Sequence, residues 1–221
     1  MLSNRFRFAK LKKRILRQRI YSRFRQYTMV PKDIYLINLQ LAETVAKTPG
    51  CVVECGVWRG GMIAGIAALL GPSRTYVLFD SFEGLPPPKD IDGLSAAAWC
   101  ADKSGPFYFN NCTADISEAE RAMKMSGAND YRFIKGWFED TIPAFVPPEP
   151  IALLRLDGDW FESTLICLKH LHTRLAPGGV VIVDDYYTWD GCARAVHTFL
   201  AGCDRPYRVG QAQNKVCFIL T

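Results

Sequence analysis

The chain has 221 residues, of which 49% are hydrophobic and 22% are charged. This composition is typical of one globular domain with a sizeable core, and it excludes a disordered chain, a collagen-like fibre and a small disulfide scaffold. The net charge of +5 hides an asymmetry, because residues 1–32 hold 11 of the 27 lysines and arginines and no acidic residue. The remainder of the chain therefore carries a net charge of −6.

The basic N-terminal segment, residues 1–30, is predicted to form a helical arm ahead of a domain that spans residues 31–221. We expect the arm to pack on its own domain or on a partner subunit, which would suit a homo-oligomer. The alternative is attachment to an anionic membrane surface or to a lipid-linked substrate. Nucleic-acid binding is not expected, because the acidic body does not continue the basic patch. The apolar residues that recur along the arm at helical spacing are Leu11, Ile15, Ile20 and Phe24.

A helix is predicted over residues 33–47, and from residue 51 onward short apolar runs alternate with helical segments. Such alternation, with almost continuously apolar strands, predicts an α/β fold whose mostly parallel sheet is covered by helices on both faces. Strands are predicted at 51–57, 75–79, 131–134, 151–156, 180–183 and 215–220, and helices at 62–70, 117–126, 162–175 and 191–200.

Two segments interrupt this alternation. Residues Glu83–Asn111 contain three consecutive prolines, scattered glycines and several aromatic residues, without clear periodicity. A long segment of this kind inside a compact domain is usually functional, so we expect a loop that covers the substrate. The alternative is an insertion without function. Residues 176–179, with the sequence APGG, are predicted to form a turn.

The eight cysteines include no CxxC pair, and several of them lie in apolar runs. We therefore expect free thiols in a reducing, cytoplasmic setting. The basic N-terminus is not followed by the apolar stretch of a secretory leader, and no run approaches the roughly 18 apolar residues of a membrane span. A cytoplasmic protein is expected, peripheral at the membrane if the arm binds lipid.

Residues at the carboxyl ends of the first two strands are candidates for ligand binding, since open α/β sheets bind their ligands there. Glu54 precedes a turn of the form G-x-x-x-G-G that begins at Gly56, and this differs from the G-x-G-x-x-G of dinucleotide-binding proteins. The second strand ends at Asp80, followed by Ser81. An acid at this place commonly binds ribose hydroxyls. Together these features predict a ligand that carries adenosine without phosphates, although a turn or capping aspartate is the alternative for Asp80.

Four aspartates follow the next two central strands: Asp157 and Asp159 after one, Asp184 and Asp185 after the other. If these strands are neighbours, four carboxylates gather at one edge of the sheet, where they would repel one another. A divalent cation bound through oxygen ligands, such as Mg²⁺, would resolve this repulsion. The alternative is a group of solvated turn and capping aspartates.

Five runs along the chain resemble the macrocin O-methyltransferase family, a group of sugar O-methyltransferases that act on antibiotics. The resemblance covers roughly residues 27–200 and implies the class I methyltransferase fold, a Rossmann-like sheet in which the fourth and fifth strands are neighbours. It also implies S-adenosylmethionine and a divalent metal, usually Mg²⁺, as cofactors. The matching runs are VVECGVWRGG (52–61), FDSFEGLPPP (79–88), GWFEDTIP (136–143), LLRLDGDWFEST (153–164) and LAPGGVVIVDDY (175–186).

The resemblance also assigns roles to residues of this chain. It implies that Asp157, Asp184 and Asp185 hold the metal and that Asp159 is the general base. It places the methionine end of the cofactor beside the first strand, the ribose beside the second and the adenine after the third. The implied cofactor-binding residues, in chain order, are Glu54, Gly56, Val57, Trp58, Asp80, Ser81, Gly136, Trp137 and Asp157.

The predicted function is therefore metal-dependent transfer of a methyl group from S-adenosylmethionine to a hydroxyl of a sugar, a glycosylated metabolite or a glycan. Three alternatives stay open. A metal held by aspartates would serve a catechol or another small phenol equally well. The fold could belong to a binding module without catalysis, although such a copy would be expected to have lost some of the aspartates. An NAD-dependent oxidoreductase is disfavoured, because its glycine motif is missing.

Overall fold

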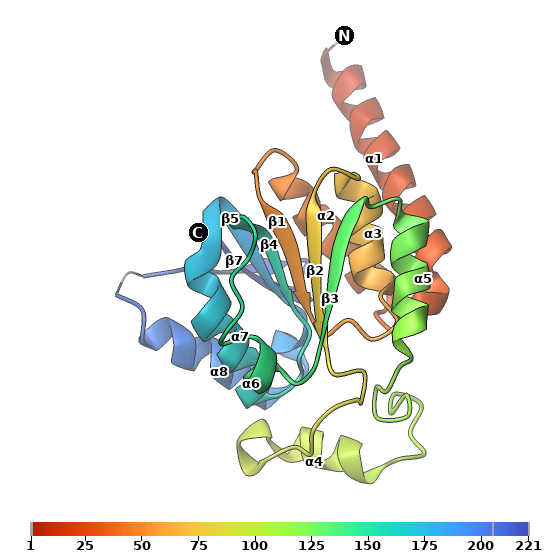
Figure 1. The fold of residues 1–221 in the computed structure, drawn as a ribbon. Coiled ribbons are helices and arrows are strands. Elements are labelled where there is room, and N and C mark those ends of the chain that lie inside the picture. Colours follow the sequence, from red (N-terminus) through yellow and green to blue (C-terminus); the bar gives the residue numbers. More distant parts are fainter. Residues whose placement is uncertain (1, 205, 221) are drawn as a thin grey trace.

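A computed structural model describes residues 2–204 and 206–220, with side chains from Arg7 onward. Its centre is a seven-stranded sheet with the order β3-β2-β1-β4-β5-β7-β6 (Figure 1). The five strands from β3 to β5 are parallel, and β7 and β6 are antiparallel at one edge. The strands are β1 (Cys51–Cys55), β2 (Thr75–Asp80), β3 (Asp130–Lys135), β4 (Ile151–Leu156), β5 (Leu175–Val183), β6 (Val209–Ala212) and β7 (Val216–Leu220).

Helices cover both faces of this sheet. One layer contains α1, α2, α3 and α5, and the other contains α6, α7 and α8, with α4 beyond the carboxyl ends of the strands (Figure 1). The predicted fold class is therefore confirmed. The helices are α1 (Leu2–Phe24), α2 (Lys32–Ala42), α3 (Gly61–Leu70), α4 (Leu94–Ala101), α5 (Ile116–Ser126), α6 (Phe138–Thr141), α7 (Phe161–Leu171) and α8 (Asp190–Ala201).

Burial explains why the central strands were visible in the sequence. Every residue of β1 and β4 is buried, so both read as unbroken apolar runs except for one charged residue each. The edge strand β6 is only partly buried and lacks such a run, so no strand was predicted there. The short helices α4 and α6 were missed as well, because eight and four residues give little periodicity.

The predicted turn at residues 176–179 is wrong, because these residues belong to β5. The pairing of β5 with β4 is irregular at this point, where the register shifts between Ile151 and Leu153. Pro177 has no N–H to donate, and Gly178 has a φ of +77°. The residue types that indicate a turn are here accommodated as an irregularity inside the strand.

The second half of the predicted arm is part of the main core. Ile20, Phe24, Tyr27 and Val30 are buried in the same cluster as residues of α2, α3 and the sheet. Arg17 also binds Glu43, with an Nη1 to Oε2 distance of 2.7 Å. Only the first turns of α1 extend beyond the body (Figure 1). No helix within the described residues combines the length and the apolar character needed to cross a membrane.

Candidate active site

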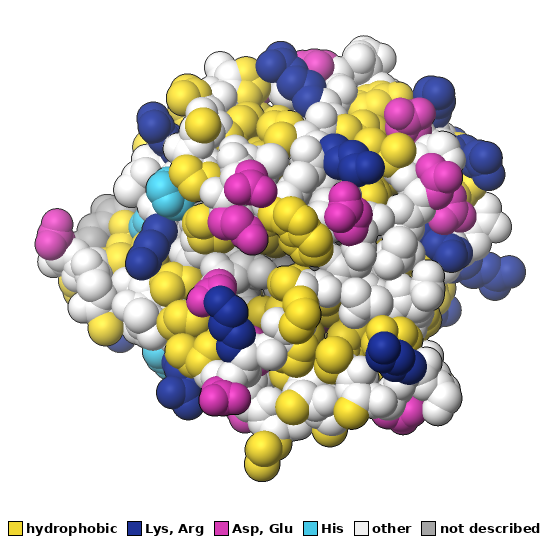
Figure 2. Space-filling model, turned by 60° about the horizontal axis from the view of Figure 1, so that its bottom comes forward, with side chains coloured by type: hydrophobic (Ala, Val, Ile, Leu, Met, Phe, Trp, Pro, Cys, Tyr) yellow, Lys and Arg dark blue, Asp and Glu magenta, His cyan; other side chains and the backbone are white. Residues whose placement is uncertain are grey.

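A cavity of about 500 Å³ lies at the carboxyl ends of the central strands. Its walls come from the connection between α1 and α2, from the loops after the parallel strands and from the segment around α4. Figure 2 turns this end of the molecule forward and shows acidic and hydrophobic side chains side by side. Of the twelve residues expected to bind cofactor or metal or to act as base, eleven line the cavity. The exception is Glu54, which is completely buried beneath it.

Glu54 belongs to a buried ionic network centred on Arg155. The two residues are register partners on β1 and β4, and Glu54 Oε1 lies 3.0 Å from Arg155 Nη1. The same Nη1 lies 2.8 Å from Asp157 Oδ2, and Nη2 lies 2.9 Å from Asp184 Oδ1. Asn38 of α2 completes the network, since it accepts from Arg155 Nε and donates to Asp184 Oδ1. One guanidinium thus orients carboxylates from three strand ends.

Arg155 and Asn38 were not singled out from the sequence. Arg155 stands inside the apolar run of β4 and is fully buried, which requires partners for its charge. That requirement, and the same one for Glu54 in the equally apolar β1, would have indicated two charged residues that need buried partners. Nothing in the sequence of α2 distinguishes Asn38, because its role depends on how α2 packs against β5.

Three carboxylates above Arg155 converge on one point. Oxygen atoms of Asp157, Asp184 and Asp185 all lie within 4.8 Å of one another. Burial and the neighbouring carboxylates raise the pKa values of Asp184 and Asp185. Asp159 lies beside these three, and of the four aspartates only Asp157 and Asp184 pair with Arg155, which also pairs with Glu54. An oxygen-liganded divalent cation would offset the remaining negative charge. The residues present therefore fit such a cation.

Asp159 is held in an unusual conformation beside these three carboxylates. Its φ is +55°, a left-handed value that non-glycine residues adopt mainly where the surroundings impose it. Its backbone N–H donates to Asp185 Oδ2 at 3.1 Å, and its Oδ1 accepts from the Trp189 indole N–H at 2.8 Å. Burial, and next the charge of Asp157, raise the pKa of Asp159 to about 7.

Asp80 fastens the turn that follows β1. Its Oδ2 accepts from the backbone N–H groups of Val57 and Trp58, at 2.6 and 2.8 Å, and its Oδ1 accepts from Phe82 N–H at 2.7 Å. A carboxylate oxygen can accept two hydrogen bonds, so Oδ1 keeps one free direction toward the cavity. Gly56 is required in this turn, because its φ is +91° and an added Cβ would lie 1.8 Å from the carbonyl oxygen of Asp157.

The remaining residues expected at the cofactor lie on the adjacent wall. Ser81 is buried, where its hydroxyl donates to the Gly84 carbonyl and accepts from Glu83 N–H. Gly136 has a φ of +144° and donates its N–H to the Asp80 carbonyl at 3.0 Å. It is followed by Trp137, the residue that precedes α6 and lines the cavity.

The segment expected to cover the substrate, residues 83–111, contains α4 and lies at the bottom of the molecule in Figure 1. Trp99 of α4 contacts Trp160 and Trp189, which follow β4 and β5, with ring centroids 5.9 and 6.2 Å apart. The Trp160 indole N–H also donates to the Pro86 carbonyl at 2.8 Å. Phe107 and Phe109 from the same segment line the cavity. The segment is thus fastened over the strand ends that carry the aspartates.

The parallel strands with the antiparallel β7 beside β5, and a cavity at their carboxyl ends, define the class I methyltransferase fold. The chain belongs to the family described as Macrocin-O-methyltransferase (TylF), whose model matches residues 15–206. The resemblance inferred from the five sequence runs is therefore confirmed. The match begins inside α1, at the residues that pack into the core.

Comparison with known proteins gives relatives with named activities. The chain is 36% identical over 173 residues to an 8-demethyl-8-(2,3-dimethoxy-alpha-L-rhamnosyl)-tetracenomycin-C 4'-O-methyltransferase of Streptomyces olivaceus, covering 75% of this chain and 62% of that protein. It is 35% identical over 166 residues to a demethyldecarbamoylnovobiocin O-methyltransferase of Streptomyces niveus, covering 72% and 61%. The chain thus spans about three fifths of the length of these relatives. The solved structure of the O-methyltransferase NovP superimposes with a TM-score of 0.71 at 30% identity, covering 88% of this chain and 81% of that one.

Proposed function

We propose that this protein transfers a methyl group from S-adenosylmethionine to a hydroxyl of a sugar on a glycosylated small molecule. The observation that carries the proposal is the position of Asp159, a half-buried carboxylate in the cavity beside three converging carboxylates. Two relatives that are more than a third identical bear the names of O-methyltransferases, and the name of the first gives a rhamnosyl-tetracenomycin C as its substrate, which supports the same conclusion.

In this proposal the cofactor lies across the ends of β1, β2 and β3. The turn from Gly56 to Trp58 faces its methionine end, the free direction of Asp80 Oδ1 receives a ribose hydroxyl, and Trp137 faces the adenine. S-adenosylmethionine supplies a methyl group on a positively charged sulfur, so transfer to an oxygen brings opposite charges together. The chain's own task is then to align the acceptor oxygen with that methyl group and to exclude water.

Asp157, Asp184 and Asp185 would hold a divalent cation, with Arg155 fixing the orientation of the first two from below. Such a cation, when bound, makes an acceptor hydroxyl more acidic. Arg155 already orients Asp157 and Asp184, Asn38 also binds Asp184, and Asp185 accepts from Asp159 N–H, so the ligand oxygens would need little rearrangement. Metal dependence is part of the proposal.

Asp159 takes the proton of the acceptor hydroxyl at Oδ2, while the Trp189 indole N–H orients the carboxylate through Oδ1. A base works best when its pKa lies near the working pH, and burial, which raises the pKa of Asp159, brings this carboxyl closer to that range. The segment around α4 covers the acceptor and contributes the aromatic side chains of Trp99, Phe107 and Phe109 as surfaces for a sugar face or an aglycone.

The test is Asp159→Asn, compared with wild type in methyl transfer from S-adenosylmethionine to a panel of glycosides, free sugars and catechols. We expect turnover of glycosides to fall by at least about a thousandfold, a typical contribution of a general base, while S-adenosylhomocysteine and Mg²⁺ bind as before.

Loss of Mg²⁺ binding in this variant would make Asp159 a metal ligand instead. Methylation of catechols alone would replace the sugar acceptor, and S-adenosylhomocysteine binding without any turnover in the panel would favour a binding module.

A further inference from the structure

The first turns of α1 form a surface that no other described part of the chain covers. Every residue from 7 to 16, here called the basic tip, is exposed. Its large apolar side chains are exposed too, with fractions of 61% for Phe8, 50% for Leu11, 43% for Ile15 and 46% for Leu16. Figure 1 shows this part of α1 projecting past the sheet. A helical segment without packing is only marginally stable in water, so contact with a partner would stabilise the tip.

The basic tip has two chemically different sides. At about 100° per residue, Phe8, Leu11, Ile15 and Leu16 fall within an arc of roughly 140°. Arg7, Lys10, Lys13 and Arg14 fall within the opposite arc of roughly 120°. Lys12 is the one cation of the tip inside the apolar arc, and its Nζ lies over the Phe8 ring at 4.8 Å. A lysine so placed can bury its stem while its ammonium reaches polar surroundings.

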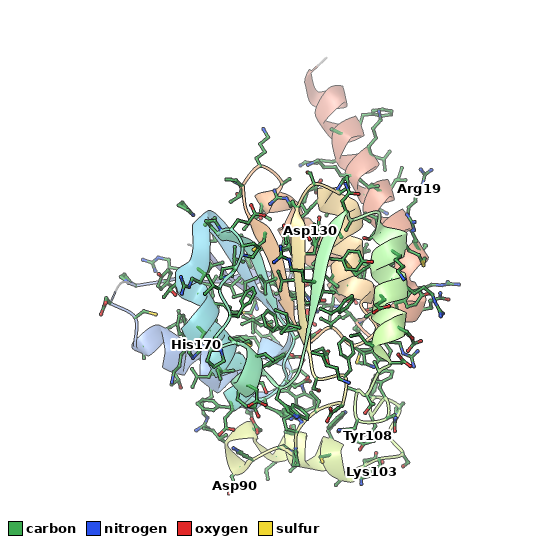
Figure 3. All side chains as sticks on the ribbon, in the orientation of Figure 1. Arg19, Asp90, Lys103, Tyr108, Asp130 and His170 are labelled. Atoms are coloured by element: carbon green, nitrogen blue, oxygen red, sulfur yellow. The ribbon has the colours of Figure 1, made fainter. Side chains whose placement is uncertain are left out.

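The apolar side of the tip does not face the body. The residues that attach α1 to the body are Arg17, Ile20 and Phe24, through the Glu43 ion pair and the core. On the helix they lie roughly 140° away from the centre of the apolar arc. Arg19 extends along the apolar side and is exposed on the outer surface of α1 (Figure 3). The apolar side is therefore open to a flat partner.

Most of the charge of the tip has no counterpart among the residues that the structure describes. Of its five cations, only Lys13 pairs with an acid, Glu43, at 3.1 Å. Arg7, Lys10 and Arg14 have no ion pair with any residue that the structure describes. No acidic residue occurs in residues 1–32. A partner must therefore supply both negative charge and an apolar phase.

We propose that the basic tip binds the surface of an anionic lipid bilayer, with its apolar side at the level of the acyl chains and its cations among the headgroups. A nucleic acid would satisfy the cations but leave four large apolar side chains in water. The acidic body of a second copy could also satisfy the charge, so dimer formation through the tip is an outcome that the experiment below distinguishes. The proposal does not rest on the methyltransferase function.

The position of the tip limits what the attachment does. The segment that covers the cavity, with Asp90 and Tyr108, lies at one end of the molecule, and the tip projects at the other, beyond Asp130 (Figure 3). A bilayer bound by the tip is therefore remote from the cavity mouth. The attachment would hold the protein at the membrane surface and leave the cavity open on the side away from the lipid.

The experiment is flotation of the full chain with vesicles of phosphatidylcholine alone, or with about one third phosphatidylglycerol to supply anionic surface. We expect binding only to the anionic vesicles, weakened by added salt. In the charge variant Lys10→Glu/Lys12→Glu/Arg14→Glu, the bound fraction should fall at least tenfold. Its matched control, Lys124→Glu/Lys169→Glu/Arg194→Glu, changes the same charge at exposed positions of the body and should bind like wild type.

A second variant, Phe8→Ser/Leu11→Ser/Ile15→Ser, tests the apolar side and should also lose binding, while its thermal unfolding matches wild type because all three residues are exposed. Wild type that fails to bind anionic vesicles at low salt overturns the proposal. So does equal loss of binding in the body control, or tighter binding to a DNA duplex than to vesicles. A dimer that dissociates in the tip variants, without vesicle binding, would make the tip an interface between copies.

Discussion

Arg155 and Glu54 stand opposite each other on β4 and β1, and their side chains pair at 3.0 Å with no more than 1% of either exposed. The other guanidinium contacts are with Asp157 and Asp184, at the edge of the cavity. The centre of the sheet and the candidate site therefore share one cation. A change at Arg155 alters both the stability of the fold and the arrangement of the aspartates.

Arg155→Met is expected to destabilise the protein by about 3–5 kcal/mol, because it leaves buried carboxylates without their counter-charge. Glu54→Gln is expected to cost far less, since an amide oxygen at the same place still accepts from Nη1. Urea unfolding of both variants measures this. Equal stability of Arg155→Met and wild type would mean that the network does not hold the strands together.

The pH dependence of stability follows from Glu54. Burial raises its pKa to about 8, against an ordinary value of 4.5, and Arg155 only partly opposes this. The folded state thus holds the proton more tightly, and the associated stability is present below about pH 4.5 and lost as the pH rises through about 8. In protein treated with a chelator, the free energy of unfolding should decline from about pH 5 to 8.

Glu54→Gln is the control for this pH dependence, and its decline should be shallower, because one titrating group is gone. The raised pKa values of Asp159, Asp184 and Asp185 act in the same direction and keep some decline. The same slope in both proteins would remove Glu54 as its source.

Most of the sheet and the positions of the aspartates could be predicted from the sequence, because local patterns encode them. The buried parallel strands are apolar runs, and Asp157, Asp159, Asp184 and Asp185 directly follow two of them. The pairing of Arg155 with Glu54 depends on strand order, which no local pattern contains. The tryptophan that holds Asp159 was also missed, since 30 residues separate the two in the chain.

Gly56 is expected to be sensitive to a single methyl group. Gly56→Ala places a Cβ 1.8 Å from the Asp157 carbonyl oxygen, so β1 and β4 must separate at the cavity, and S-adenosylhomocysteine binding should be lost. The matched control is Gly71→Ala, where φ is +101° but nothing lies within 4 Å of the added Cβ. It should cost only about 1–2 kcal/mol of backbone strain. Calorimetric titration of both variants compares them, and intact binding in Gly56→Ala would contradict the geometry.

Trp189 is expected to position Asp159 through its indole N–H. Trp189→Phe should lower kcat about tenfold, equivalent to about 1.4 kcal/mol of barrier, with little change in the KM for S-adenosylmethionine. In the control Trp160→Phe the lost N–H donates to Pro86 and not to Asp159, so kcat should change less. Steady-state kinetics decide between them. Equal loss of kcat in both variants would reduce Trp189 to a packing residue.

The most direct test of the central claim is calorimetric titration of S-adenosylhomocysteine and of Mg²⁺ into wild type and Asp184→Ala. We expect both proteins to bind the nucleoside and wild type alone to bind Mg²⁺, since Asp184 is one of the three converging carboxylates. Nucleoside binding without any Mg²⁺ binding in wild type would contradict the metal site while leaving the methyltransferase fold in place. No nucleoside binding to wild type would contradict the proposed function itself.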